Sequence, residues 1–138
     1  CAESCTGGML ASRLTSISGS SMYIKGSIVT YSNEAKMKFL DVDKEILDTK
    51  GAVSPEVAKQ MAEGVRKAVG SDIGVGITGI AGPTGGTDKK PVGLVYIAVA
   101  GKDNTVVKEN VFSGDRARVR YRSTQQALEM IRQYIKNK

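Results

Sequence analysis

Helical and strand patterns alternate along this chain, and the alternation limits its fold class more than any other feature of the sequence. Short apolar or β-branched runs at 27–31, 73–78, 94–100 and 106–112 predict strands. The last two runs are joined by Gly101-Lys102-Asp103-Asn104, which predicts an antiparallel hairpin. Helices alternating with strands, together with one hairpin, predict an α/β sandwich built on a mixed sheet.

Five helices are expected from apolar spacing and from residues that cap helix ends. The clearest signal is Ser54-Pro55-Glu56, which supplies a cap, a first-turn proline and a first-turn acid, and Gly70 ends that helix. Two short helices are expected from Ser32-Asn33 and from Asp43. The apolar faces are expected to include Leu10, Leu14 and Ile17 in a helix ending near Ser18-Gly19; Ile46 and Leu47; Val57, Met61, Val65 and Ala68; and Thr124, Ala127, Leu128, Ile131 and Ile135 in a helix from about Asp115.

Residues 1–138 are expected to form a single domain, because the chain has no internal repeat and no linker that would divide it. Apolar residues make up 41% and charged residues 25%, as in soluble globular proteins. No apolar run approaches the ~20 residues of a membrane span, and the first residues do not resemble a signal peptide, so we expect a cytoplasmic location. The chain begins without Met, and a preceding segment or domain is expected.

The net charge of +6 favours an anionic partner. With no tryptophan, five tyrosines and two phenylalanines, the chain lacks an aromatic RNA-binding signature, which favours a small anionic metabolite over a nucleic acid. Cys1 and Cys5 are expected to be reduced thiols, because a disulfide framework needs more cysteines. They make a poor metal site, since the chain has no histidine.

The absence of histidine also excludes a Ser-His-Asp or Cys-His catalytic group within the chain. Lysine is the remaining base that activates a serine. Ser4 immediately precedes a predicted helix, where backbone N–H groups can stabilise an oxyanion, and Gly7 and Gly8 let a substrate approach the main chain. The alternative is that Ser4 or Thr6 only caps the helix.

Lys36 lies in the first turn of a short predicted helix, where the helix dipole disfavours a positive charge. Burial there would lower its pKa from about 10.4 toward neutrality. Tyr31, at the end of the preceding strand, is a candidate to relay a proton. The alternative is a surface lysine beside a half-buried tyrosine.

The segment Gly79-Ile80-Ala81-Gly82-Pro83-Thr84-Gly85-Gly86-Thr87 follows a strand, where α/β proteins bind phosphates. It lacks the P-loop ending and the dinucleotide spacing, so neither ATP nor NAD is indicated. Lys89 and Lys90 beyond it resemble a basic flap, and a plain surface loop is the alternative. Arg116 falls in the first turn of the last helix, where the helix dipole disfavours a positive charge. A bound phosphate would offset this effect.

The blocks AESCTGG, TYSNEAK, GAVS, GIAGPTGGT, KPVG and FSGDR resemble the C-terminal domain of the competence/damage-inducible protein A family. They occur in the order of that family and run from Ala2 to Arg120. Stand-alone members of the family are nicotinamide-nucleotide amidases. The resemblance implies a three-layer α/β/α sandwich with a mixed five-stranded sheet, and self-association, for example as a dimer. Family members carry a helix and a strand before AESCTGG, which this chain lacks.

The resemblance further implies hydrolysis of nicotinamide mononucleotide to nicotinate mononucleotide and ammonia, with no metal or organic cofactor. Ser4 matches the family nucleophile, Lys36 its lysine and Tyr31 its tyrosine. The substrate-binding residues that we expect are Cys5, Thr6, Gly7, Gly8, Gly79, Gly82, Gly85, Gly86 and Arg116, with the oxyanion at the amides of Thr6 and Gly7. Two other functions are considered: a non-catalytic domain that senses a pyridine nucleotide for an attached domain, and a DNA-associated role, whose affinity would fall steeply with salt.

Overall fold

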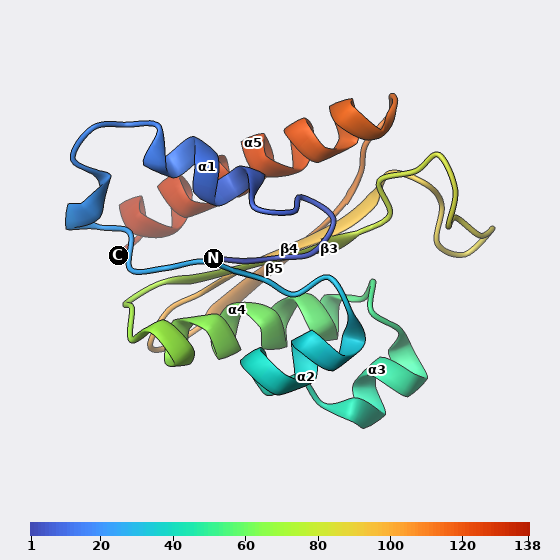
Figure 1. Ribbon diagram of the computed structural model, residues 1–138, viewed down its shortest axis with the longest axis horizontal. Coiled ribbons are helices and arrows are strands. Elements are labelled where there is room, and N and C mark those ends of the chain that lie inside the picture. Colours follow the sequence, from blue (N-terminus) through green and yellow to red (C-terminus); the bar gives the residue numbers. More distant parts are fainter.

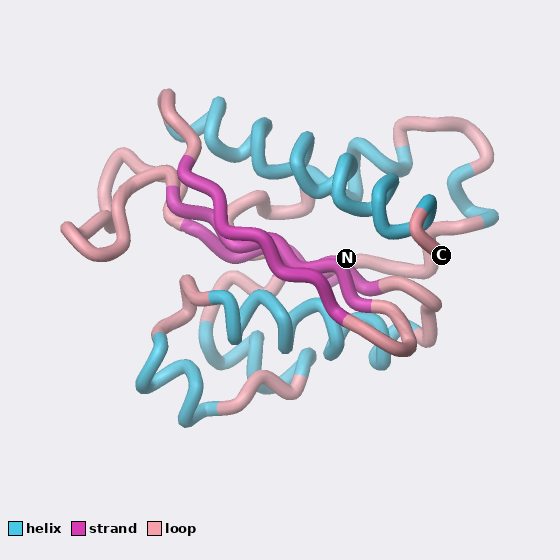
Figure 2. The backbone as a smooth tube through the Cα atoms, turned by 180° about the vertical axis from the view of Figure 1, so that it is seen from behind, coloured by secondary structure: helices cyan, strands magenta, loops and turns pink.

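A five-stranded mixed sheet separates two layers of helices in the computed structural model, which describes residues 1–138 (Figures 1 and 2). The sheet order is β2-β1-β3-β4-β5. The strand β1 runs parallel to β2 and β3, whereas β4 runs antiparallel to its two neighbours, β3 and β5. The strands are β1 (Ala2–Glu3), β2 (Ile28–Val29), β3 (Gly74–Gly79), β4 (Leu94–Ala100) and β5 (Thr105–Val111).

The predicted mixed sheet and its hairpin are confirmed, with small shifts in the ends of the strands. The strand β2 keeps only two of the five residues predicted. The strand β1 is equally short and has no sequence period that could predict it, yet it supplies the fifth strand by lying between β2 and β3. None of the helices has the length and apolar character needed to cross a membrane.

The helices α1 and α5 cover one face of the sheet, and α2, α3 and α4 cover the other (Figure 1). The helices are α1 (Met9–Thr15), α2 (Asn33–Leu40), α3 (Lys44–Lys50), α4 (Pro55–Val69) and α5 (Arg116–Lys136), with a short 3-10 turn at Ser20–Met22. The three-layer α/β/α architecture expected from the resemblance is therefore the one observed.

The predicted helix caps form by side-chain hydrogen bonds. The Ser54 hydroxyl accepts from the N–H of Val57 at the start of α4, and Gly70 ends that helix in the left-handed conformation at φ 63°. The side chains of Ser32, Asp43 and Asp115 likewise accept from the first turns of α2, α3 and α5. These local signals locate the four helices without any tertiary information.

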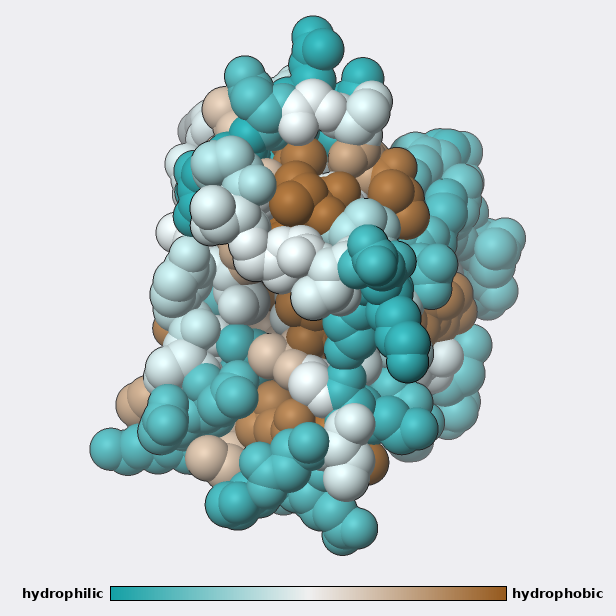
Figure 3. All heavy atoms as spheres, turned by 90° about the vertical axis from the view of Figure 1, so that its right-hand side faces the viewer, coloured by the Kyte–Doolittle hydropathy of each residue, from teal (hydrophilic) through white to brown (hydrophobic).

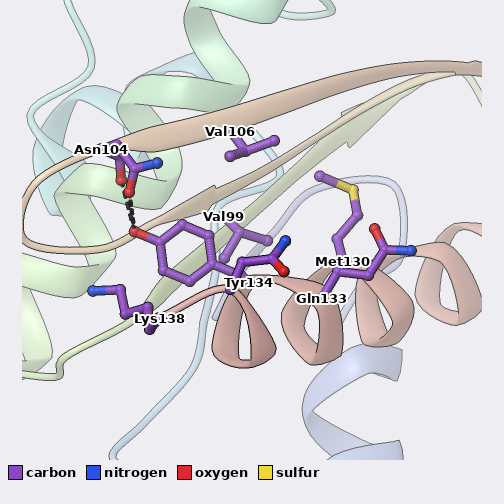
Figure 4. Close-up of a pocket in the computed structure, with 8 residues that line it drawn as sticks. Val99, Asn104, Val106, Met130, Gln133, Tyr134 and Lys138 are labelled. Atoms are coloured by element: carbon purple, nitrogen blue, oxygen red, sulfur yellow. Dashed lines mark hydrogen bonds between the residues drawn. The ribbon is translucent and has the colours of Figure 1, made fainter.

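Three residues expected on buried helix faces are exposed. The expectation that Ile17 is buried is wrong because α1 ends at Thr15. The same expectation for Ala68 is wrong because Val69 packs inward instead. Ile135 is also exposed, because Tyr134 points inward and its hydroxyl donates to Asn104 in the turn between β4 and β5 (Figure 4). The buried residues of α5 are Val119, Ser123, Thr124, Ala127, Met130 and Tyr134.

The helix α4 lies unusually close to the sheet because the contact is made of small residues. A Cβ at Gly76 would lie 2.5 Å from the carbonyl oxygen of Ala58, so only glycine fits there. Ala58 and Ala62 of α4 pack against Ala98 and Ala100 of β4. This close contact holds α4 against the sheet. The helix α2, which packs in the same layer, is thereby held beside the ends of β1 and β3.

Candidate active site

A cavity of about 280 Å³ lies where the parallel strands β1, β2 and β3 end. Loops following parallel strands meet at one edge of a sheet, which is where α/β proteins bind ligands. Figure 3 views this end of the molecule, where hydrophobic patches show between hydrophilic residues. The cavity is lined by Ser4, Cys5, Tyr31, Lys36, Arg116 and residues 52–53, 78–82 and 84–85.

Ser4 and Lys36 meet at the floor of this cavity. The N–H of Ser4 donates to the carbonyl of Ile77 at 3.0 Å, which attaches the residue to β3. The Nζ atom of Lys36 lies 3.2 Å from the Oγ of Ser4 and 2.8 Å from the carbonyl oxygen of Thr30. Two residues 32 positions apart in sequence are thus within hydrogen-bond distance of each other.

The Lys36 side chain is 1% exposed and forms no salt bridge. Burial lowers the pKa of its amine, because the low-polarity surroundings disfavour the charged form. A neutral amine donates to the carbonyl of Thr30 and keeps a lone pair that can accept from the Ser4 hydroxyl. The alternative of a surface lysine is therefore wrong, whereas Tyr31 is 64% exposed rather than half-buried.

Neither Ser4 nor Thr6 caps α1, so the alternative role for these hydroxyls is also wrong. The N-cap residue is Gly8, which makes no side-chain cap. The fully buried carboxylate of Glu3 instead accepts from the N–H groups of Leu10 and Ala11 and from the Thr6 hydroxyl. The Glu3 carboxylate thus binds N–H groups at the start of α1, and the Ser4 hydroxyl makes no hydrogen bond with this helix.

Cys5 also lines the cavity and is the neighbouring candidate nucleophile. It is a free thiol, as is Cys1. Burial raises the pKa of the Cys5 thiol to about 11, which keeps the sulfur protonated near neutral pH. Since the thiolate is the reactive form of cysteine, Ser4 is the better nucleophile of the two.

The amides expected to receive an oxyanion differ in availability. The N–H of Gly7 donates to the carbonyl of Ser4 at 3.0 Å and is therefore occupied. The amides of Cys5 and Thr6 donate to no backbone carbonyl. Thr6, Gly7 and Gly8 lie outside the lining of the cavity, and only Cys5 of this group contributes to it.

Arg116 and Tyr31 meet at the opening of the cavity. One guanidinium nitrogen of Arg116 donates to the carbonyl of Gly82 at 2.9 Å, and the other donates to the Tyr31 hydroxyl at 3.2 Å. No hydrogen bond joins Tyr31 to Ser4 or Lys36. Arg116 is exposed at the first position of α5, so its charge faces any anion that enters.

The glycine-rich loop forms one wall of the cavity and then projects away from the body of the protein (Figures 1 and 2). Gly79, Gly82 and Gly85 line the cavity, whereas Gly86 does not. The Lys90 amine reaches back to the carbonyl of Lys50 at the end of α3. This contact joins the loop to the end of α3, just before Ala52 and Val53, which also line the cavity.

Four features of the site were missed by sequence reasoning. These are the Glu3 carboxylate; the Arg120 guanidinium, which donates to the carbonyls of Cys5 and Thr6; the Thr78 hydroxyl, which donates to the carbonyl of Ala52; and the wall at Ala52 and Val53. The block GAVS and the third arginine of the last helix are visible in the sequence, but neither has a local pattern that assigns a role. No three His, Cys, Asp or Glu side chains gather anywhere in the chain as metal ligands would.

Comparisons with known proteins agree with the fold and with the motifs. Residues 1–135 match the family model of the CinA C-terminal domain. A putative competence-damage inducible protein of Moorella thermoacetica is 58% identical over 130 residues, which are 94% of this chain and 31% of that protein. A CinA-like protein of Koribacter versatilis is 58% identical over 134 residues, which are 97% of this chain and 32% of that protein. The chain thus spans about a third of the length of these curated relatives.

Solved structures show the same architecture. The competence/damage inducible protein CihA from Agrobacterium tumefaciens has a TM-score of 0.92 and 44% identity, covering 94% of this chain and 80% of that one. A CinA superfamily protein from Escherichia coli has a TM-score of 0.92 and 37% identity, covering 96% of this chain and 77% of that one. By the family model, by sequence identity and by fold, the chain belongs to the CinA C-terminal domain family.

Proposed function

We propose that this domain is an amidohydrolase that converts nicotinamide mononucleotide to nicotinate mononucleotide and ammonia. The observation that carries the proposal is the buried, unpaired amine of Lys36 at 3.2 Å from the Ser4 hydroxyl. A serine is a weak nucleophile without a base, and a lysine serves as base only when it is neutral. The substrate follows from the resemblance of the sequence blocks to the nicotinamide-nucleotide amidases.

In the first half of the reaction, Ser4 Oγ attacks the carboxamide carbon while the Lys36 amine takes the hydroxyl proton. The carbonyl oxygen becomes an oxyanion beside the free amides of Cys5 and Thr6. The carbon–nitrogen bond then breaks, and the Lys36 ammonium returns the proton to the departing nitrogen. Ammonia leaves, and a nicotinoyl ester remains on Ser4.

In the second half, a water molecule replaces ammonia. Lys36, neutral again, takes a proton from this water as it attacks the ester carbon. Collapse of the second oxyanion releases the carboxylic acid, and the proton returns to Ser4 Oγ. Nicotinate mononucleotide then leaves with its carboxylate ionised, and the protein is restored without any cofactor being consumed.

The phosphate of the substrate has two recognition elements at the opening of the cavity. Arg116 supplies a fixed positive charge, oriented by the carbonyl of Gly82 and the hydroxyl of Tyr31. The backbone at Gly82 and Gly85 forms the adjacent wall. In this arrangement Tyr31 orients Arg116, and the proton passes directly between Ser4 and Lys36.

The test is ammonia release from nicotinamide mononucleotide, measured for the unaltered protein, for Ser4→Ala and for Ser12→Ala. Ser12 is an exposed serine of α1 and is the matched control. The assay is run on this chain. We expect Ser4→Ala to lower kcat by about 10³-fold or more and Ser12→Ala to leave it unchanged.

Mass spectrometry of the protein quenched during turnover should show a nicotinoyl adduct on the peptide that contains Ser4. If the unaltered protein binds the nucleotide without releasing ammonia, the proposal fails, and the same cavity is then a sensing site for pyridine nucleotides. If Ser4→Ala keeps the activity, the assigned nucleophile is wrong.

A further inference from the structure

The loop that carries Ser4 has an uneven pattern of hydrogen bonds over three consecutive peptide units. Its carbonyls are all occupied: that of Ser4 by the N–H of Gly7, that of Cys5 by Arg120, and that of Thr6 by Arg120 and the N–H of Met9. The amides of Cys5 and Thr6, by contrast, donate to no backbone carbonyl. Every acceptor of this segment is thus used, while two adjacent donors remain free.

Arg120 makes two of these carbonyl contacts from a distant element. It lies in the second turn of α5, 115 and 114 positions from the residues that it contacts. Its Nε donates to the carbonyl of Cys5 and one terminal nitrogen donates to the carbonyl of Thr6, both at 3.0 Å. The guanidinium also packs against Gly7, where an added Cβ would lie 3.4 Å from it.

The charge of Arg120 has no other evident use. It forms no salt bridge with any carboxylate, although the side chain is partly buried. It does not line the cavity, so its donors are not presented to a substrate phosphate. Arg116, one helical turn earlier, faces the cavity instead.

Peptide geometry links these carbonyl contacts to the free amides. In a trans peptide unit the C=O and the N–H point in opposite directions across one rigid plane. Fixing the carbonyl of Cys5 therefore fixes the direction of the N–H of Thr6. The Ser4–Cys5 unit is fixed in the same way by Gly7, and its free N–H belongs to the residue after the nucleophile, where an oxyanion donor is needed.

We infer that Arg120 is a positioning residue that orients the Thr6 amide in an oxyanion hole formed by the amides of Cys5 and Thr6. The inference rests on the proposed function and extends it to a residue outside the cavity. Arg120 touches neither substrate nor reacting atoms. It acts by holding the peptide plane that joins Cys5 and Thr6, and so the Thr6 amide, in the orientation that the transition state requires, so its loss affects the chemical step more than binding.

The first experiment compares Arg120→Gln, Arg120→Lys and Arg118→Gln in the ammonia-release assay with nicotinamide mononucleotide. Arg118 is exposed on the same helix and is the matched control. We expect Arg120→Gln to lower kcat about 10–100-fold with KM changed less than about two-fold. Arg120→Lys should recover only part of this loss, because a single ammonium cannot contact both carbonyls in the geometry of a guanidinium.

These kinetics overturn the inference in two cases. The first is an Arg120→Gln variant that keeps the kcat of Arg118→Gln. The second is a variant whose KM rises while kcat is retained, since that result would make Arg120 a substrate-binding residue. Affinity for nicotinate mononucleotide, measured by calorimetry, should be equal in the Arg120→Gln and unaltered proteins, which also shows that the variant is folded.

A second experiment removes the dependence on substrate identity. A fluorophosphonate forms a bond between phosphorus and Ser4 Oγ with loss of fluoride, while Lys36 takes the serine proton. The phosphoryl oxygen gains charge in this step and needs the same amides. We expect the second-order rate of labelling to fall at least about ten-fold in Arg120→Gln and to be unchanged in Arg118→Gln.

The two experiments separate the two proposals. If the unaltered protein labels at Ser4 but releases no ammonia, the proposed amidase function fails, and the labelling rates alone decide the role of Arg120. If ammonia is released and the Arg120→Gln and Arg118→Gln variants are both labelled at the rate of the unaltered protein, the amidase function stands and the inference about Arg120 is wrong. A protein that neither labels at Ser4 nor releases ammonia overturns both.

Discussion

At the residue scale, the amine of Lys36 is buried between the carbonyl of Thr30 and the hydroxyl of Ser4 with no carboxylate partner. Such a group destabilises the folded protein, because its charged form loses hydration that no opposite charge replaces. We expect Lys36→Met to abolish ammonia release and to raise the free energy of unfolding near neutral pH by about 1–3 kcal/mol. Urea denaturation and the ammonia assay check the two effects, and a destabilised variant would contradict the account of Lys36.

The same variant should change how stability depends on pH. Burial lowers the pKa of Lys36 below its ordinary value of 10.5. Between the folded and unfolded pKa values, the unfolded chain binds a proton that the folded chain does not, so the stability of the unaltered protein rises with pH. The advantage of Lys36→Met should therefore shrink between neutral pH and about pH 10. In parallel, kcat/KM of the unaltered protein should rise with pH until Lys36 is neutral.

The sequence predicted the candidate nucleophile and base, but not the residues that hold the loop around Ser4 in place. The lack of histidine pointed to lysine, and the position of Lys36 near a helix start suggested a perturbed base. Arg120 and Glu3 could not be assigned in the same way. Their roles depend on contacts with the chain folded around Ser4, and nothing in the spacing of α5 says which of its four early arginines reaches back to residue 5.

At the element scale, Gly64 sets the distance between α4 and α2. A Cβ at this position would overlap the carbonyl oxygen of Leu40 at the end of α2. Gly64→Ala, which would normally favour a helix, should instead destabilise the protein by about 1–3 kcal/mol and reduce kcat by displacing the helix that carries Lys36. Thermal unfolding and ammonia release measure both changes.

The matched control for Gly64→Ala is Ala68→Gly, an exposed position of the same helix. It should cost about 1 kcal/mol from helix propensity alone, with kcat unchanged. A stabilised Gly64→Ala variant with full activity would show that α2 can shift without consequence for the site.

Elements with capping chemistry were predicted closely, and elements defined by tertiary contact were not. The start of α4 at Pro55 and its end at Gly70 follow from local hydrogen bonds. The strands β1 and β2 have two residues each, too few for a period of two to be visible. The buried face of α5 was displaced because Tyr134 turns inward to the β4–β5 turn, a contact 30 residues away.

At the scale of the whole molecule, the net charge of +6 should steer an anionic nucleotide toward the cavity. We expect kcat/KM for nicotinamide mononucleotide to fall several-fold as salt rises from about 10 mM to about 500 mM, with kcat nearly constant. Steady-state kinetics over this range test the prediction. Binding of duplex DNA should be measured alongside these kinetics, because tight binding of the DNA at physiological salt would instead support a DNA-associated role.

The contacts of α5 with the Ser4 loop also carry a consequence for biosynthesis. Ser4 and Lys36 are translated before Arg116 and Arg120, which belong to α5 and follow the other described elements in chain order. A nascent chain that has not yet reached residue 116 has its nucleophile and base without the guanidinium groups that complete their surroundings. The order of synthesis thus delays assembly of the site until α5 has been translated, because the contacts of Arg116 and Arg120 cannot form before then.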